Sequence, residues 1–394
     1  MRAHPHEPCY REHAQGTIEV AGQNQTALAD GRGKLLAHLV ACGYARCEPA
    51  LLQPASAFLE LRGEDIRGRL YLTTDTSGEE LCLRPEYTIP VCRAYLGSAA
   101  AGQPASFSYL GPVFRQLAGG PGETVQAGLE SFGRTDREAA DADVLACALE
   151  AAQAAGAPTL HIRFGDAGLS RKFLDALALP PTWSRRIAQG IAQGRTLDAI
   201  VQSAGNGATG DHSGVLAALD GVDKVGARAL VEDLLSIAGI SSVGGRSAGE
   251  IAERFLEQAA LRSGPAIPAE KKDLLAKFLV LTGEPDAASA GLRRLAGDAR
   301  LDLGATLDAF DRRIHFLAAR GIDLAHTGYA AGFARRLDYY TGFVFEGYVP
   351  EGPDTRPLVG GGRYDALLRF LGAASDIPAV GAAIYVDRLA ESAS

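Results

Sequence analysis

A short stretch near the carboxyl end of the chain gathers side chains that could bind a polar ligand. Arg335, Asp338, Tyr339 and Tyr340 supply a cation, an acid and two phenols within a few residues. The β-branched and aromatic residues that follow favour a strand, and a second strand pattern begins near Gly360. This predicts a hairpin with polar groups at one end. For this pattern alone, the alternative is a core hairpin whose tyrosine hydroxyls only satisfy internal partners.

An earlier hairpin carries a second polar cluster. Residues 70–74 and 81–83 are strand-like and flank the turn sequence Asp-Thr-Ser-Gly at 75–78, which suits a tight connection. The hairpin delivers the run from Arg84 to Thr88, which contains a cation, an acid and two hydroxyls. This cluster is therefore also expected at the end of a strand.

The elements that must position these clusters follow from hydrophobic spacing. An amphipathic helix is predicted from Leu28 to Val40, with Gly43 as its stop. The segment 44–52 contains Pro49 and is expected to be a strand at an edge or interface, because proline removes one ladder donor. The next predicted elements, in chain order, are strands at 107–115 and 124–134, a helix at 141–155 and a strand at 161–164.

Helical periodicity dominates from Gly168 to about His326, and strand patterns resume only at Leu337. We interpret this region as a helical insertion in a β-rich domain. Residues 1–166 and 327–394 are expected to form one discontinuous core, and residues 167–326 the helical insertion domain. The polar first 25 residues or so are expected to be a partly disordered tail, with a loose arm as the alternative.

Composition excludes several classes of protein. The chain has 394 residues, is 47% hydrophobic and contains no apolar run long enough for a membrane span or a signal peptide, so we expect a cytoplasmic protein without membrane contact. A net charge of −8 argues against a dedicated nucleic-acid binder. The six cysteines form no Cys-x-x-Cys pair, and no histidine lies near them at metal-ligand spacing. No disulfide or metal site is therefore expected.

Six motifs, spread over about residues 27–390, occur in an order that resembles the catalytic core of histidyl-tRNA synthetase. Each is weak alone, but six in register are specific. The resemblance implies an α+β fold of the class II aminoacyl-tRNA synthetase type, an antiparallel sheet flanked by helices with a helical insertion. The motifs are Arg84-Pro85-Glu86-x-Thr88, Gly111-Pro112-Val113-Phe114-Arg115, Gln126-x-Gly128-x-Glu130-x-Phe132-Gly133, Arg335-x-Leu337-Asp338-Tyr339-Tyr340-Thr341-Gly342, Gly361-Gly362-Arg363-Tyr364-Asp365 and Pro378-Ala379-Val380-Gly381 with Asp387-Arg388-Leu389.

The resemblance also implies a histidine pocket. Such a pocket needs an acid for the α-ammonium, a cation for the α-carboxylate, and an acceptor and a hydroxyl for the imidazole. The implied contacts are Glu86 and Thr88 with the amino end, Gln126 and Arg335 with the carboxylate region, and Glu130 and Tyr340 with the imidazole, with Tyr339 lining the pocket and Arg115 as a further candidate. The alternative is an inherited internal hydrogen-bond network that holds no ligand.

Departures from the synthetase pattern disfavour ATP chemistry. Arg115 and Arg388 are present, but the loop at 116–122 has no charged side chain to stabilise a triphosphate. Tyr385 stands where the resemblance calls for a glycine, and its ring would fill space that adenine needs. We therefore expect no catalytic residues and no cofactor.

The sequence ends at Ser394, six positions beyond Arg388, whereas a synthetase would continue into an anticodon-binding domain of roughly a hundred residues. No tRNA contact is expected. This combination resembles the regulatory subunits of ATP phosphoribosyltransferase. That resemblance implies a non-catalytic partner of a short-form catalytic subunit in a hetero-oligomer, a hetero-octamer, with a homodimer contact through residues 28–52 and histidine as a candidate ligand. The alternatives are a histidine-activating, ATP-dependent ligase and a truncated histidyl-tRNA synthetase.

Overall fold

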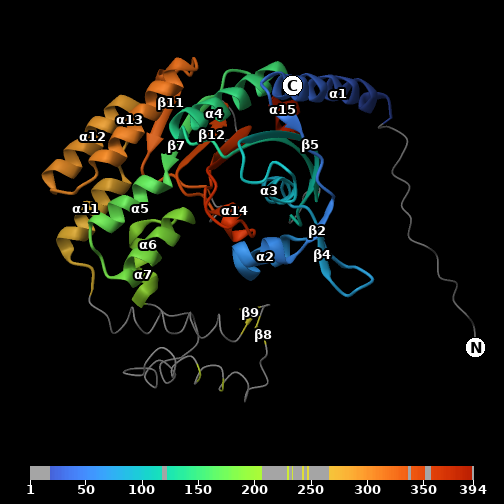
Figure 1. The fold of residues 1–394 in the computed structure, drawn as a ribbon. Coiled ribbons are helices and arrows are strands. Elements are labelled where there is room, and N and C mark those ends of the chain that lie inside the picture. Colours follow the sequence, from blue (N-terminus) through green and yellow to red (C-terminus); the bar gives the residue numbers. More distant parts are fainter. Residues whose placement is uncertain are drawn as a thin grey trace, which may run out of the picture.

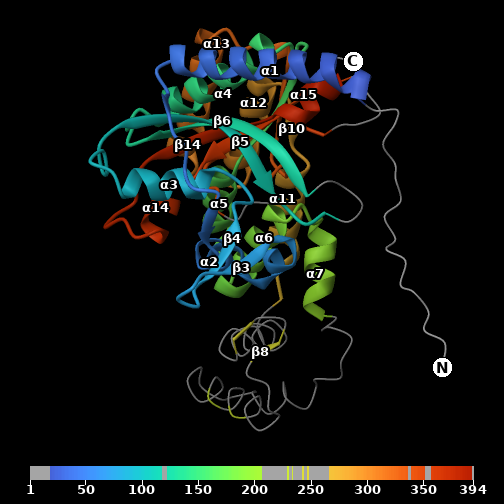
Figure 2. The ribbon, with the colours of Figure 1, turned by 90° about the vertical axis from the view of Figure 1, so that its right-hand side faces the viewer.

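The computed structural model of the chain (Figures 1 and 2) describes residues 18–117, 122–205, 266–335, 339–350 and 356–392, with a few isolated residues between 229 and 247. Its centre is a nine-stranded sheet in the order β1-β5-β6-β14-β13-β12-β7-β11-β10. The strands are β1 (Ala45–Arg46), β5 (Ala105–Phe114), β6 (Glu123–Phe132), β7 (His161–Asp166), β10 (Thr282–Gly283), β11 (Thr327–Ala330), β12 (Phe343–Tyr348), β13 (Val359–Arg363) and β14 (Ala379–Tyr385).

The predicted fold, a sheet flanked by helices, is confirmed, but the sheet is mixed rather than wholly antiparallel. β1 pairs with β5 and β11 pairs with β7 in parallel, while the central strands from β5 to β7 pair antiparallel. Each parallel pair joins segments far apart in the sequence, so no local sequence pattern could predict it. The predicted pairing of 107–115 with 124–134 is confirmed by the β5–β6 hairpin.

Helices cover both faces of the sheet (Figure 2). α1 and α4 lie over one face, where they share a continuous apolar core with the sheet. α3 and α14 lie under the other face, within a second apolar cluster. The helices are α1 (Ile18–Ala41), α2 (Ser56–Arg62), α3 (Thr88–Leu96), α4 (Arg137–Ala154), α5 (Ala167–Ala176), α6 (Pro181–Ala192), α7 (Leu197–Gly205), α11 (Ala269–Leu279), α12 (Pro285–Asp298), α13 (Gly304–Ala319), α14 (Leu367–Phe370) and α15 (Val386–Ser392), with 3-10 turns η1 (Gly63–Arg69) and η2 (Leu324–His326).

The predicted first helix is confirmed and begins earlier than the apolar pattern indicated. Leu35 and Leu39, one turn apart, are fully buried, while Val40 is 49% exposed. α1 packs along α4, whose inner face is largely alanine. Small side chains let the two helix axes approach closely, so these helices form one layer over the sheet.

The prediction of a single strand at 44–52 is wrong. It divides into β1 and a second strand, β2 (Leu52–Pro54), and these belong to different sheets. β2 pairs with β4 (Glu80–Leu83), which also pairs with β3 (Leu72–Thr74). Pro49 lies between β1 and β2, where the chain leaves the main sheet and needs no ladder donor.

The two predicted hairpins are confirmed with shifted boundaries. In the β3–β4 hairpin, the Asp75 carboxylate accepts hydrogen bonds from the backbone N–H groups of Ser77 and Glu79 at 2.8 and 2.9 Å, which fixes the turn. β12 and β13 pair as expected, but β12 begins at Phe343, so Tyr339 and Tyr340 precede the strand. They are held in the connection that enters it.

Strands also resume earlier than predicted. β11 at Thr327–Ala330 and the two-residue β10 belong to the main sheet, and a further short pair joins β8 (Ser242–Val243) to β9 (Arg246–Ser247). α12 and α13 lie side by side at the β10–β11 end of the sheet (Figure 1). The strand pattern of β11 was hidden because the run Thr-Gly-Tyr-Ala is short and half glycine and alanine.

A buried ion network ties α13 to the sheet. Asp141 on α4 accepts from Arg363 Nε at 2.9 Å and from Arg313 Nε at 2.8 Å. Arg313 also donates to Asp166 at 2.8 Å, and Arg363 to Asp365 at 2.9 Å. Because opposite charges offset the cost of burying one another, the network can hold α4, α13, β7 and β13 together in the core.

The loop at 118–121, the helical pattern at 226–235 except for two isolated residues, and Leu337 with Asp338 lie outside the described residues, as does most of the predicted amino-terminal tail. None of the helices in the described part of the chain has the length and apolarity needed to cross a membrane.

Candidate functional site

A cavity of about 720 Å³ lies at the face of the sheet that α3 covers, where the ends of several segments meet. It is large enough for an amino acid and falls within the usual range for small-molecule sites. The start of α3, strand β6, the hairpin β12–β13 and strand β14 all contribute to its wall. The sequence-predicted residues that line it are Glu86, Thr88, Arg115, Gln126, Arg335, Tyr339 and Tyr340.

Glu86 combines two roles at the start of α3. Its carboxylate accepts hydrogen bonds from the backbone N–H groups of Thr88 at 2.9 Å and Ile89 at 2.8 Å. These are amide groups of the first helical turn that have no partner within the helix. These two hydrogen bonds fix the carboxylate in the cavity wall, to which it brings a negative charge.

Glu130 lies behind the wall rather than on it. Its side chain is fully buried, and it accepts hydrogen bonds from the hydroxyls of Thr88, at 2.8 Å, and Tyr364. The Tyr109 hydroxyl lies 3.4 Å away. Gly381 is required beside it, because a Cβ at that position would collide with the Glu130 carboxylate. Burial raises the pKa of Glu130 to about 8, although the hydroxyl hydrogen bonds oppose the rise.

Arg335 is the central cation of the cavity. Its guanidinium donates to the Tyr340 hydroxyl at 3.1 Å and to the Tyr385 hydroxyl at 3.0 Å, and Nε lies 3.4 Å from Glu346. The guanidinium lies flat against Gly360, where a Cβ would approach its central carbon to 2.7 Å. Burial raises the pKa of Tyr340 to about 12 against the opposing effect of Arg335, so this phenol stays protonated and can donate.

Tyr385 lines the same cavity, directly across the β6–β14 pair from Gln126, at the position where the resemblance calls for a glycine. Its hydroxyl accepts from Arg335, and its ring packs under the Arg388 guanidinium, 4.1 Å from the ring centre. Burial raises the pKa of Tyr385, but the positive charges of Arg335, Arg115 and Arg388 outweigh burial and lower it. The side chain therefore contacts both Arg335 and Arg388 and fills the space between them.

Gln126 provides an acceptor that the protein leaves open. The residue is 5% exposed, lies on β6 and lines the cavity. Its buried Oε1 has no hydrogen-bond partner within the described part of the chain. A buried acceptor without a donor is costly. A ligand that carries N–H groups would satisfy it.

Sequence reasoning missed two residues that shape the site. Tyr364 supplies the hydroxyl that anchors Glu130, and Glu346 balances the charge of Arg335. Tyr364 lies in the motif Gly-Gly-Arg-Tyr-Asp that was quoted for the resemblance, so its position was a usable signal. Glu346 lies on a strand and no motif marked it.

The chain is similar to known proteins over nearly its full length. The family model described as histidyl-tRNA synthetase matches residues 16–243 and 216–389. The ATP phosphoribosyltransferase regulatory subunit of Brucella canis is 41% identical over 346 residues, which is 87% of this chain and 91% of that protein.

Solved structures agree on the fold. An ATP phosphoribosyltransferase regulatory subunit/histidyl-tRNA synthetase from Bacillus halodurans is 21% identical, with a TM-score of 0.68 and coverage of 98% of this chain and 84% of that one. A histidine–tRNA ligase subunit from Alicyclobacillus acidocaldarius is 25% identical, with a TM-score of 0.57 and coverage of 99% and 97%. Given the family match, the 41% identity over most of both chains and the shared fold, this chain belongs to the histidyl-tRNA synthetase-like family of ATP phosphoribosyltransferase regulatory subunits.

Proposed function

We propose that this chain is the non-catalytic regulatory partner of a short-form ATP phosphoribosyltransferase catalytic subunit and makes the first step of histidine biosynthesis responsive to histidine. The observation that carries the proposal is the set of side chains around the cavity. Glu86, Gln126 and Arg335 line it and can recognise an amino acid. Tyr385, which is paired with Gln126 across β6 and β14, brings a bulky phenol into the same cavity and contacts Arg335 and Arg388. A site that keeps amino-acid recognition without triphosphate stabilisation suits sensing rather than adenylation.

Histidine is the proposed ligand of this cavity. Its ammonium group would meet Glu86 and the open acceptor of Gln126, and its carboxylate would pair with Arg335. Glu130 is fully buried behind Thr88 and Tyr364, which line the cavity. A direct contact between Glu130 and the imidazole therefore requires one of these two side chains to move aside.

The first test separates a regulator from the two alternatives, a histidine-activating ligase and a truncated synthetase. Pure protein is assayed for histidine-dependent ATP–pyrophosphate exchange, with a histidyl-tRNA synthetase as the positive control. We expect no exchange, because Tyr385 packs against Arg388, a cation that the resemblance would place at the triphosphate, and the loop at 116–122 carries no charged side chain. Robust exchange would refute the non-catalytic assignment.

The second test asks for the partner. Co-expression with a short-form catalytic subunit is expected to yield one complex on size exclusion, with activity that exceeds that of the catalytic subunit alone and that histidine inhibits. We propose a hetero-octamer in the cytoplasm, which mass photometry would measure. Separate elution of the two chains, or activity unaffected by this chain, would contradict the proposal.

A homodimer of this chain through residues 28–52 is part of the proposed assembly. Val40, Leu51 and Leu52 are 45–49% exposed in the single chain, and such side chains favour burial against a partner. Light scattering at micromolar concentration is expected to give a dimer that Leu51→Asp weakens. Leu117→Asp, also at an exposed leucine, is the control, and a monomeric wild type would contradict the dimer.

A further inference from the structure

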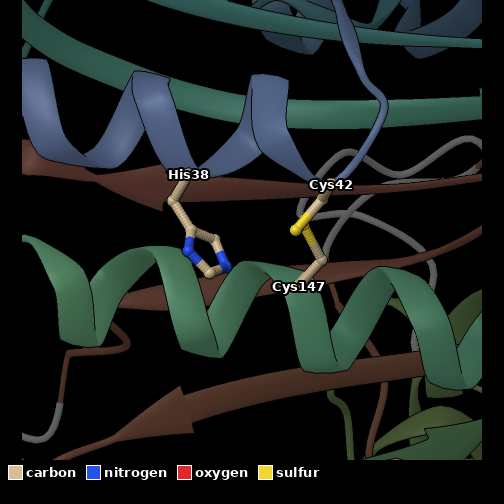
Figure 3. A group of neighbouring side chains, drawn as sticks. All are labelled: His38, Cys42 and Cys147. Carbon is tan, nitrogen blue, oxygen red and sulfur yellow. The ribbon is translucent and has the colours of Figure 1, made fainter.

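Three potential metal ligands meet between α1 and α4, on the opposite side of the sheet from the cavity. They are His38 in the last turn of α1, Cys42 just beyond its end and Cys147 on α4 (Figure 3). One nitrogen of His38 and the two cysteine sulfurs all lie within 4.8 Å of one another. No metal site was expected from the sequence, because it has no Cys-x-x-Cys pair and no histidine was identified at ligand spacing. His38, four residues before Cys42, was not weighed, and Cys147 on a distant helix could not be foreseen.

Local backbone structure holds two of the ligands in register. The backbone N–H of Cys42 donates to the carbonyl oxygen of His38 at 2.9 Å, which continues the helical pattern for one residue past α1. Residues four apart lie on the same helix face. His38 and Cys42 therefore both face α4, and Cys147 meets them from the opposite helix.

A carboxylate lies beside the group. Oε2 of Glu150 lies 3.3 Å from Nε2 of His38, and Glu150 Oε1 lies 3.6 Å from Arg320. Zinc bonds of about 2.0–2.3 Å place neighbouring tetrahedral ligands roughly 3.3–3.8 Å apart. The histidine–carboxylate distance matches that spacing, whereas the three cluster ligands lie within 4.8 Å of one another, so the side chains must draw closer around an ion.

We propose that His38, Cys42 and Cys147, with the adjacent Glu150, form a binding site for a divalent transition-metal ion, of which zinc is the best match. Two thiolates, an imidazole and a carboxylate are a donor set that zinc accepts in four-coordinate sites. Each thiol gives up its proton when its sulfur binds the ion. The ion would join the end of α1 to α4 and so fix the corner where the chain enters β1.

Access and burial fit such a site. Cys42 is exposed and Cys147 is buried, and both are free thiols in the structure. An ion can therefore enter past Cys42. Burial, together with the neighbouring Cys42 and Glu150, raises the pKa of the Cys147 thiol. A bound divalent cation offsets this, because it stabilises the thiolate directly.

The test uses full-length protein without a histidine tag, purified with a phosphine reductant and stripped with a chelator. Cobalt(II) is the spectroscopic probe, and zinc competes for it. We expect one cobalt ion per chain with thiolate-to-cobalt charge-transfer absorption, displacement by zinc, and a higher melting temperature with either metal. Absence of the charge-transfer band would overturn the proposal.

Variants locate the ion. Cys42→Ser, at an exposed position that tolerates serine, is expected to abolish the charge-transfer band, and Glu150→Gln to weaken binding roughly 10- to 100-fold. Cys47→Ser is the matched control inside the described structure. Cys9→Ser controls for the amino-terminal segment, which lies outside the described residues and also contains histidines. A band that survives Cys42→Ser but not Cys9→Ser would overturn the site.

The same two cysteines could instead join to each other. Two results together would overturn the metal site. One is an intact mass lower by two hydrogen atoms after purification without reductant, which indicates a disulfide. The other is a lack of metal uptake after phosphine has restored the two thiols. Full alkylation of the exposed Cys42 in stripped protein, and its protection when zinc is bound, is the expected result.

Discussion

Two buried groups of arginines and acids lie within this fold, and they differ in how their charges are paired. In the network around Asp141, arginines pair with carboxylates. Arg363 and Arg313 each donate to a different oxygen of the Asp141 carboxylate. In the cavity, tyrosine and threonine hydroxyls contact Arg335 and Glu130, and Glu346 lies 3.4 Å from Arg335. Gln126 keeps an acceptor without a partner among the described residues.

The difference separates a structural network from a binding site. Paired charges offset each other's desolvation and leave nothing for a ligand. Hydroxyls neutralise no charge, and they can rotate toward an incoming group without moving the backbone. Breaking the first group should therefore have its largest effect on stability, whereas removing the Arg335 cation from the second should have its largest effect on ligand binding.

Breaking the closed network should give the largest effect. Asp141→Ala leaves two buried guanidiniums without their shared partner, and loss of one member of a buried pair costs about 3–5 kcal/mol. Urea unfolding is expected to show this loss in the free energy of unfolding. Arg293→Ala, which breaks an exposed pair with Asp308 and Asp311, is the control, with an expected change below about 1 kcal/mol. Equal effects of the two variants would remove the distinction.

Removing the cavity cation should mainly affect histidine binding. Arg335→Ala leaves the ligand carboxylate desolvated and unpaired, which costs about 2–5 kcal/mol and weakens binding well over tenfold. Isothermal titration of histidine measures the change, and feedback inhibition of the reconstituted complex should weaken with it. Arg163→Ala is the matched control, because Arg163 also lines the cavity but is half exposed. Unchanged binding in Arg335→Ala would place the histidine site elsewhere.

Removing the hydrogen bond between Arg335 and Tyr385 should have a smaller effect. Tyr385→Phe keeps the ring under Arg388 but removes the hydroxyl that accepts from Arg335. A hydrogen bond to a charged group contributes about 1.5–3 kcal/mol. We expect a loss of this size in the free energy of unfolding, against almost none for Tyr71→Phe at an exposed tyrosine. No difference between the two variants would show that the hydroxyl is replaceable by water.

The pH dependence of stability gives the finest test of the cavity. The pKa of Glu130 is about 8 in the folded chain against an ordinary value of 4.5. Between these values the folded state holds a proton that the unfolded state has lost, so stability falls as the pH rises, by up to about 1.4 kcal/mol per pH unit. Glu130→Gln cannot ionise and should flatten this slope between pH 5 and 8. An equally steep slope in the variant would assign the effect to another group.

Much of the fold followed from local patterns. The hairpins β3–β4, β5–β6 and β12–β13 and the helices α1 and α4 were predicted because alternation, helical spacing and turn residues act over a few positions. The division of the segment around Pro49 into two sheets and the strand β11 were not, because each depends on a partner more than fifty residues away in the chain.

For the site, the sequence by itself determined which chemical groups are present: the acid of Glu86, the cation of Arg335 and the phenol of Tyr385 in place of a small residue. Motif order could establish these because it depends only on residue type and spacing. Tertiary structure alone decided that Glu130 lies behind the wall, that Tyr385 engages Arg335, and that His38 and Cys147 meet across two helices. These are contacts between distant segments, and their geometry is set by how the sheet and its two helical layers pack.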